Sequence, residues 1–226
     1  MREVDPDEPG AQCCTMRFDD VRSLFRADAE RYLFYTNRKF SQRSLAVILA
    51  TQPGILATAL YRFGHWAHQQ EGLKGRWCRI LHDLAQRPIE ILTGISIAPT
   101  AHVGPGLYIA HFGGVIVGAS CVIGTRCNLG PDTLISSGRG DERRSPRLGD
   151  RVNVSSGGRV LGPIHVGHDV MIGVNVVVIA DVPARTVLAA PLPVVLSHRG
   201  SFDYVRYAGD ESDPARSESA GLRSDA

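Results

Sequence analysis

The chain has 226 residues, of which 43% are hydrophobic and 21% charged, and its formal net charge is +2. This balance excludes a wholly disordered chain, and the near-neutral charge provides no field that would favour nucleic acid as a partner. With 24 glycines and 13 prolines against an aromatic content of 7%, long helices throughout are excluded. A collagen-like chain is excluded because glycine does not recur at every third position.

The two ends of the chain, residues 1–16 and about 209–226, are polar and lack hydrophobic periodicity, so we expect both to be disordered. Near the N-terminus no basic stretch precedes an apolar one, and no signal peptide is expected. The most apolar stretch, 45–60, is interrupted at 52–54 and is too short to span a bilayer. An odd number of cysteines without a CxxC pair indicates a reducing compartment. We therefore expect a cytoplasmic protein with no membrane partner.

Residues 17–94 are expected to form an α-helical segment, because apolar residues recur there at helical spacing. The Gln52-Pro53-Gly54 step is expected to kink or break the helical run, since proline removes a backbone donor. The expected helices cover about 19–35, a stretch that starts at Ser41 or Ser44, 54–70 and 74–92.

After this segment the apolar residues recur at every sixth position. An α-helix turns by about 100° per residue, so this spacing would scatter them around three sides of a helix. In a strand, a spacing of six keeps them all on one face. Glycine, proline, aspartate and asparagine within each unit favour short strands joined by corners, whose coils stack into a solenoid with one continuous core. The three sets are Ile97, Val103, Ile109 and Val115, then Val117, Ile123, Leu129 and Ile135, then Leu148, Val154, Val160, Val166, Ile172 and Val178.

The hexads 123–128 and 172–177 resemble the hexapeptide repeat of left-handed parallel β-helix acyltransferases. More narrowly, the segments 103–115 and 160–167 resemble the serine O-acetyltransferase family. The resemblance implies a mainly β fold, a left-handed parallel β-helix over 95–195 with a loop at 136–147, preceded by the helical segment. Residues 196–226 would then form a C-terminal extension.

The resemblance also implies an acetyl-CoA-dependent O-acetyltransferase. His111, in the context Tyr108-Ile-Ala-His-Phe-Gly-Gly114, matches the family's catalytic histidine. A neutral imidazole near pH 7 suits the removal of a proton from a hydroxyl group. We expect direct transfer to a hydroxyl of serine, a related small metabolite or a sugar, with no acyl-enzyme.

Three polar positions of the family's site are changed. Ser96 stands where an acidic residue orients the histidine, Ala110 replaces an acidic residue before it, and Ser145 replaces a second histidine. A histidine without an acidic partner can still act as a base, but its tautomer is less well fixed. These departures put serine in question as the acceptor more than they question acetyl transfer.

The resemblance further implies that acetyl-CoA lies along the coils, beside small residues that let its pantetheine arm approach the backbone. Arginines of the loop are candidates for its phosphates. No metal is expected; three histidines on such a helix can bind zinc in another family, but the spacing here does not resemble that family's motif. The candidate positions are Gly138, Gly140, Arg144, Ser156, Gly157, Gly173 and Val174.

As partners we expect a small hydroxyl substrate and a homotrimer, with the pairing of two trimers left open. No complex with cysteine synthase is expected, because the chain ends in Ser224-Asp225-Ala226 and not in the isoleucine that docks there in the family. Two alternatives remain open at this point. One is a non-catalytic β-helix that serves as a scaffold or regulator, and the other is a transferase with a different acyl donor or an amine acceptor.

Overall fold

The computed structural model describes residues 17–138, 145–192 and 194. Residues up to Ala190 belong to one compact unit, and those from Pro191 on belong to a second. The expectations for 1–16 and 196–226 concern residues outside the described part of the chain.

Four helices lead into the unit: α1 (Phe18–Tyr35), α2 (Gln42–Thr51), α3 (Pro53–Gln69) and α4 (Gly72–Thr93). Ser41 caps α2, where its Oγ accepts a hydrogen bond from the Ser44 backbone N–H at 3.1 Å. The expected break lies at Gln52, where α2 and α3 meet at a bend of 102°. None of the described helices alone is long and apolar enough to cross a bilayer. Taken together, α2 and α3 have sufficient length and apolar composition, but the pair is bent.

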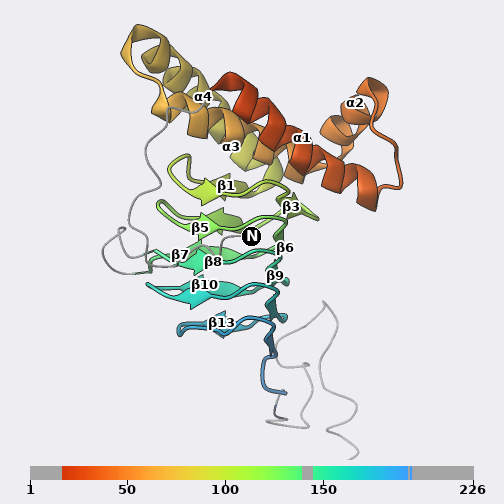
Figure 1. The fold of residues 1–226 in the computed structure, drawn as a ribbon, viewed down its shortest axis with the longest axis vertical. Coiled ribbons are helices and arrows are strands. Elements are labelled where there is room, and N and C mark those ends of the chain that lie inside the picture. Colours follow the sequence, from red (N-terminus) through yellow and green to blue (C-terminus); the bar gives the residue numbers. More distant parts are fainter. Residues whose placement is uncertain (1–16, 139–144, 193, 195–226) are drawn as a thin grey trace, which may run out of the picture. The chain divides into compact units, whose positions relative to one another are not determined.

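Short strands follow and form three parallel sheets that share one stack of coils (Figure 1). The first sheet contains, in order, β1 (Ile95–Ile97), β4 (Val115–Val117), β7 (Leu134–Ser136), β10 (Arg159–Leu161) and β13 (Val177–Val178). The second contains β2 (His102–Val103), β5 (Val122–Ile123), β8 (Arg147–Leu148) and β11 (His165–Val166). The third contains β3 (Tyr108–Ile109), β6 (Asn128–Leu129), β9 (Asn153–Val154), β12 (Met171–Ile172) and β14 (Val187–Leu188).

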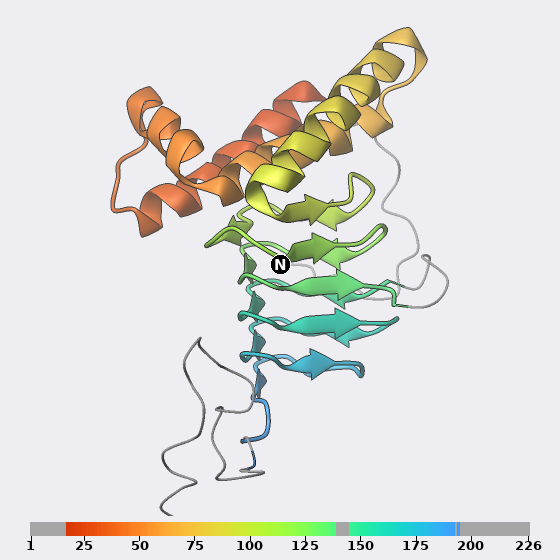
Figure 2. The same ribbon diagram turned by 180° about the vertical axis from the view of Figure 1, so that it is seen from behind.

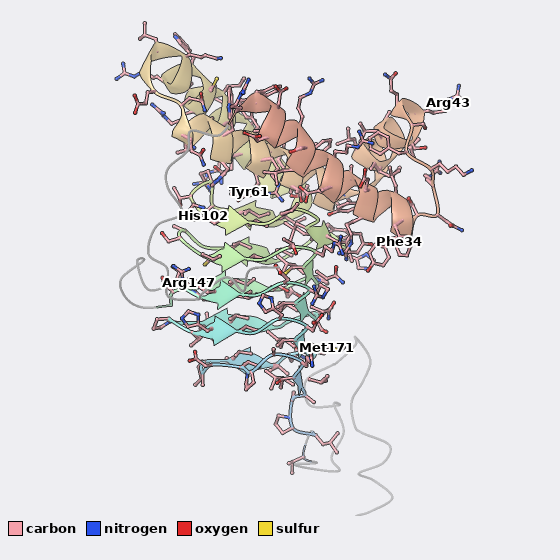
Figure 3. All side chains as sticks on the ribbon, viewed as in Figure 1. Phe34, Arg43, Tyr61, His102, Arg147 and Met171 are labelled. Atoms are coloured by element: carbon pink, nitrogen blue, oxygen red, sulfur yellow. The ribbon has the colours of Figure 1, made fainter. Side chains whose placement is uncertain are left out.

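Each coil visits the three sheets in turn, so that every strand pairs with the strand one coil later. Residues at the hexad positions point inward and are buried, and residues beside them point outward. Figure 3 shows outward side chains such as His102 and Arg147 on the second sheet and Met171 on the third. Close stacking explains the glycines after the inward residues: a Cβ at Gly124 would lie 2.5 Å from the Gly149 carbonyl oxygen. The expected β-helix of hexapeptide repeats behind a helical segment is confirmed.

The helices pack on the β1 end of this stack through buried polar side chains. Asp28 accepts hydrogen bonds from the Arg62 guanidinium at 2.8 and 3.1 Å and from the backbone N–H groups of Gly106 and Leu107, both at 2.8 Å. The Arg62 guanidinium also donates to the carbonyl oxygen of Gly104 at 2.7 Å. Burial raises the pKa of Asp28, against the lowering effect of Arg62 and of the backbone donors. The pair therefore joins α1 and α3 to the first coil.

A buried histidine in α3 makes the folded state sensitive to acid. His65 lies against the Pro99 carbonyl oxygen, 2.7 Å from Nδ1. Burial lowers the pKa of His65; the Pro99 carbonyl opposes this shift, and nearby His102, Arg62 and His68 add to it. The folded state therefore binds its proton less readily than the unfolded state. The stabilisation is complete above the ordinary pKa of about 6.5 and is lost as the pH falls toward the lowered value.

We expect the free energy of unfolding to fall between about pH 7 and pH 5, and His65→Asn to flatten this dependence. Asparagine can keep a donor near the Pro99 carbonyl but does not titrate. Urea denaturation at a series of pH values measures the slope, and His165→Asn, on an exposed histidine of β11 that does not act on His65, is the control. An equal slope in the wild type and in His65→Asn would contradict the assignment.

Candidate functional site

His111 lies at the corner that joins β3 to β4. The inward residues on either side of this corner, Ile109 and Val117, are two residues further apart than Leu129 and Ile135 on the next coil. The first two sets of hexads, which end at Val115 and resume at Val117, are thus out of phase by two residues, and the two extra residues lie in the corner that carries His111. The chain turns there through Gly113 (φ 103°) and Gly114 (φ 66°), conformations that glycine adopts without strain.

The end of α4 holds this corner in place (Figure 2). The Gly113 backbone N–H donates to the Thr93 carbonyl oxygen at 2.8 Å. Gly94 ends the helix with φ at 66°, and a Cβ there would lie only 2.8 Å from the Gly113 Cα. The base of the His111 corner is thus packed against the helical segment while the imidazole itself is exposed.

The imidazole lies at the wall of a hollow of about 400 Å³, a size ordinary for small-molecule sites. Helix α1 ends on one side of it, the bend between α2 and α3 forms another, and β3 with its corner forms the third. Tyr35 and Tyr108 are stacked there with their ring centroids 4.2 Å apart. Burial raises the pKa of Tyr108. The lining residues are Tyr35, Thr36, Thr51, Gln52, Pro53, Tyr108, Ala110, His111 and Phe112.

The three changed positions have separate surroundings. Ser96 Oγ donates to Glu90 Oε1 at 2.6 Å, and the Gln86 amide donates to the same oxygen at 2.8 Å. Ala110 lines the hollow. Ser145 is buried, and its hydroxyl donates to the Ala119 carbonyl oxygen at 2.9 Å. Within the described residues, neither serine contacts His111, and the imidazole makes no hydrogen bond.

Four of the seven candidate acetyl-CoA contacts, called carrier positions below, lie on the same edge of the stack as His111. This His111 edge is the set of corners between the third and first sheets, residues 110–114, 130–133, 155–158 and 173–176. Backbone bonds run down it: Asp132 N–H to the Gly113 carbonyl at 3.1 Å, Gly157 N–H to Pro131 at 2.9 Å, and Asn175 N–H to Ser156 at 3.0 Å. Ser156, Gly157, Gly173 and Val174 all belong to it.

Of the four candidate acetyl-CoA positions on this edge, Ser156 and Val174 are exposed. Gly157 has a structural reason to be glycine, because a Cβ there would lie 2.0 Å from Asn175 Oδ1. Gly173 has one too, since its Cβ would lie 2.6 Å from the Leu188 carbonyl oxygen. These two glycines are therefore explained by coil stacking whether or not a ligand lies beside them.

Gly138 lies elsewhere, after β7 at the corner between the first and second sheets. Its backbone N–H donates to Ser136 Oγ at 3.3 Å, and open space lies where a Cβ would stand. Gly140 and Arg144 fall outside the described residues. A single chain therefore brings four of the seven carrier positions onto the His111 edge, and it does not bring Gly138 there.

Sequence reasoning did not identify the other walls of the hollow or the Glu90 carboxylate. Tyr108 belongs to the motif around His111, so its proximity had a signal in the sequence. Tyr35 and Gln52 at the hollow, and Glu90 beside Ser96, had none, because only the packing of the helices on the first coil brings them to these places. In the parts of the chain that the structure describes, no three His, Cys, Asp or Glu side chains gather as metal ligands.

No family model matches the chain. It is 32% identical over 174 residues to the serine acetyltransferase of Synechococcus elongatus, covering 76% of this chain and 69% of that protein. It is 36% identical over 163 residues to that of Mycobacterium tuberculosis, covering 70% and 69%. With that of Helicobacter pylori the identity is 41% over 137 residues, covering 60% and 77%.

The solved structures with a similar fold are also serine acetyltransferases. Serine acetyltransferase isoform 3 of Entamoeba histolytica, in complex with cysteine, superposes with a TM-score of 0.64 at 26% identity, covering 80% of this chain and 63% of that one. The soybean serine acetyltransferase apoenzyme gives 0.63 at 27%, covering 75% and 66%. The chain thus spans slightly less than two thirds of the length of these solved relatives.

Proposed function

The chain belongs to the serine acetyltransferase family, and from this we propose that it transfers the acetyl group of acetyl-CoA to a hydroxyl of serine or of a related small molecule or sugar. The observation that carries the proposal is the position of His111. The residue heads an edge of small residues along the coils and also lines a hollow large enough for a small acceptor.

We propose that His111 acts as the general base. Its imidazole would take the proton of the acceptor hydroxyl, so that the oxygen attacks the thioester carbonyl carbon as the carbon–sulfur bond breaks. The imidazolium would then return the proton to the departing thiolate. Acetyl-CoA supplies an activated acyl group, and no metal is required in this scheme. Intact-mass measurement with acetyl-CoA alone should detect no acetylated protein.

Mixing the protein, acetyl-CoA and a panel of alcohols while CoA release is followed tests the proposal. We expect release that depends on the alcohol. Release with an amine or with another acyl thioester, and not with an alcohol and acetyl-CoA, would instead favour the hexapeptide transferase of different specificity. Absence of release throughout would contradict acetyl transfer.

The proposed acetyl-CoA track runs along the His111 edge. Ser156 is exposed there, so a bulky side chain can replace it without disturbing the core. We expect Ser156→Trp to raise the KM for acetyl-CoA at least tenfold by covering the track, with little change in thermal stability. Steady-state kinetics at saturating acceptor measure this, and Arg159→Trp, on the exposed face of β10, is the control. An unchanged KM would remove Ser156 from the track.

Gly138, Gly140 and Arg144 remain proposed carrier contacts. Because Gly138 lies on another edge of the same chain, it would meet the carrier of a neighbouring copy. This agrees with the proposed homotrimer. An exposed apolar row on α4 also favours association, since water-exposed leucine and tryptophan side chains gain free energy when covered. Its members are Leu73, Trp77, Leu81, Leu84 and Ile91, each at least 60% exposed.

Light scattering on the full chain measures the assembly. A mass of three or six chains would support the trimer and decide whether trimers pair, and a monomer would contradict it. The expectation of no cysteine synthase complex rests on residues 224–226, which lie outside the described part of the chain, and it stays a prediction. Co-purification with cysteine synthase would contradict it.

A cytoplasmic location is also part of the proposal. Its support is the cysteine usage: Cys78, Cys121 and Cys127 are all free thiols. Burial raises the pKa of the Cys121 and Cys127 thiols to about 11 each, which keeps them protonated and unreactive. Cell fractionation tests the location directly.

One observation favours the scaffold alternative. Within the described chain His111 has no hydrogen-bond partner, and Ser96 donates its hydroxyl proton to Glu90. A histidine so placed is compatible with a site that has lost its activity. Calorimetry with acetyl-CoA separates the two functions, since a transferase must bind it and a scaffold need not.

A further inference from the structure

The first coil ends the stack, so its strands have no further strand to pair with on the side that faces the helices. In the third sheet, β3 lies at the end of the order and pairs only with β6. The Tyr108 backbone N–H donates to the Cys127 carbonyl oxygen of the next coil at 3.0 Å. Ile109 turns its own N–H and C=O the opposite way, since these groups alternate along a strand. Because Ile109 is buried, leaving both groups without a partner would be costly.

One hydroxyl of α1 supplies both partners. The Tyr32 hydroxyl accepts a hydrogen bond from the Ile109 N–H at 2.9 Å and donates to the Ile109 carbonyl oxygen at 3.1 Å. Burial raises the pKa of Tyr32, so the hydroxyl keeps its proton and can do both. Gly54 leaves the space, because a Cβ there would lie 2.5 Å from the Tyr32 hydroxyl oxygen and closer still to the Ile109 carbonyl oxygen. Tyr32 thus stands in for a missing strand.

Aromatic rings hold the same strand. The Tyr108 ring lies against both Tyr32 and Tyr35, with ring centroids 4.7 and 4.2 Å away. Both neighbours belong to α1, so the strand that leads to His111 is fixed to one helix by ring contacts as well as by hydrogen bonds. The substitution Tyr32→Phe keeps the ring and removes only the hydroxyl. It therefore isolates the hydrogen bonds.

His111 lies midway between two residues whose backbones are anchored by helices. Two residues before it, Ile109 is bonded to Tyr32 of α1. Two residues after it, the Gly113 N–H donates to the Thr93 carbonyl oxygen at the end of α4, at 2.8 Å. The corner between these anchors contains glycines with positive φ, a residue type that restrains its own backbone least. The position of the imidazole therefore depends on the two anchors.

We infer that Tyr32 is a positioning residue for His111 and acts through the backbone of Ile109. The inference rests on the proposed function, in which His111 is the base, and it adds a residue from outside the motif that contains the histidine. Tyr32 is buried and is not among the residues that line the hollow. Its loss should lower kcat, which depends on the alignment of the reacting groups, and leave the KM for acetyl-CoA unchanged.

Helix α3 offers a matched control in Tyr61, whose hydroxyl has the same role at β2 of the first coil. It accepts a hydrogen bond from the Val103 N–H at 3.1 Å and donates to the Ala101 carbonyl oxygen at 2.8 Å (Figure 3). Tyr61 is buried as Tyr32 is. Tyr61→Phe therefore removes the same two kinds of hydrogen bond from the same coil, but from a strand of the second sheet that does not carry His111.

The test measures kcat and the KM for acetyl-CoA on the full chain, with the best acceptor of the panel, for the wild type, Tyr32→Phe and Tyr61→Phe. Thermal unfolding of each sample sets a temperature at which all three are folded. We expect Tyr32→Phe to lower kcat about tenfold or more and to change the KM by less than about twofold. Tyr61→Phe should change neither, although both variants should lower the unfolding temperature by similar amounts.

Hydrogen exchange followed by mass spectrometry measures the backbone independently of activity. Amides of 108–115 should exchange faster in Tyr32→Phe, and those of 101–105 should do so in Tyr61→Phe. Wild-type kcat in Tyr32→Phe, equal losses of kcat in the two variants, or unchanged exchange at 108–115 in Tyr32→Phe would overturn the inference. Absence of CoA release by the wild type would overturn the proposed function, while faster exchange at 108–115 would still support the hold of Tyr32 on the corner.

Discussion

His111→Ala is expected to lower kcat/KM for acetyl transfer by about 10²–10⁴-fold, the range that a positioned general base contributes. The imidazole is exposed at its corner and makes no hydrogen bond within the described residues, so its removal leaves no buried group without a partner. Stability should therefore change by no more than about 0.5 kcal/mol. Initial rates of CoA release, with thermal unfolding on the same samples, measure both.

The control is His165→Ala, which removes another exposed imidazole, from β11 on the second sheet. It should leave the rate unchanged. Should His111→Ala retain the wild-type rate, His111 is not the base, and another group must remove the proton. A loss of rate together with a loss of folding would point to a structural role of the corner.

Asp28→Ala is expected to destabilise the chain by about 3–5 kcal/mol, because it leaves the Arg62 guanidinium buried without its counter-charge. The change also removes the acceptor for the backbone N–H groups of Gly106 and Leu107. Since Arg62 cannot shed its proton, no change of pH relieves the penalty. Urea denaturation at one fixed protein concentration measures it, because association also contributes to stability.

Glu30→Ala is the matched control, since it removes an acidic residue of the same helix from an exposed pair with Arg26, whose side chains are 65% and 55% exposed. Such pairs contribute at most about 1 kcal/mol. Equal losses for Asp28→Ala and Glu30→Ala would show that the buried pair does not hold the helices on the coils.

The β-helix could be predicted from the sequence because its signal is local and repeated. Each hexad places one inward residue, and all the members from Ile97 to Val178 that set the period are buried. The two-residue shift between the first and second sets of hexads corresponds to the longer corner that carries His111. The helices were predictable from their spacing, with the break at Gln52, although Pro88 lies inside α4 without ending it.

The site was predictable only in part, because it combines elements from distant parts of the chain. The motif identified His111, and the coil geometry places Ser156 and Val174 on its edge. Gln52 and Tyr35 enter the site through the packing of α1 and α3 on the first coil, which depends on Asp28 and Arg62. A pair separated by 34 residues, like other non-local contacts here, has no periodic signature.

We propose that this β-helix moves an acetyl group from acetyl-CoA to an alcohol. The most direct test is the stoichiometry of one reaction mixture, in which free CoA thiol and acetylated alcohol are both quantified by mass spectrometry. We expect the two products to appear in equal amounts and both to fall together in His111→Ala. CoA released without any acetylated acceptor, or acetyl-CoA left unchanged beside every alcohol offered, would contradict it.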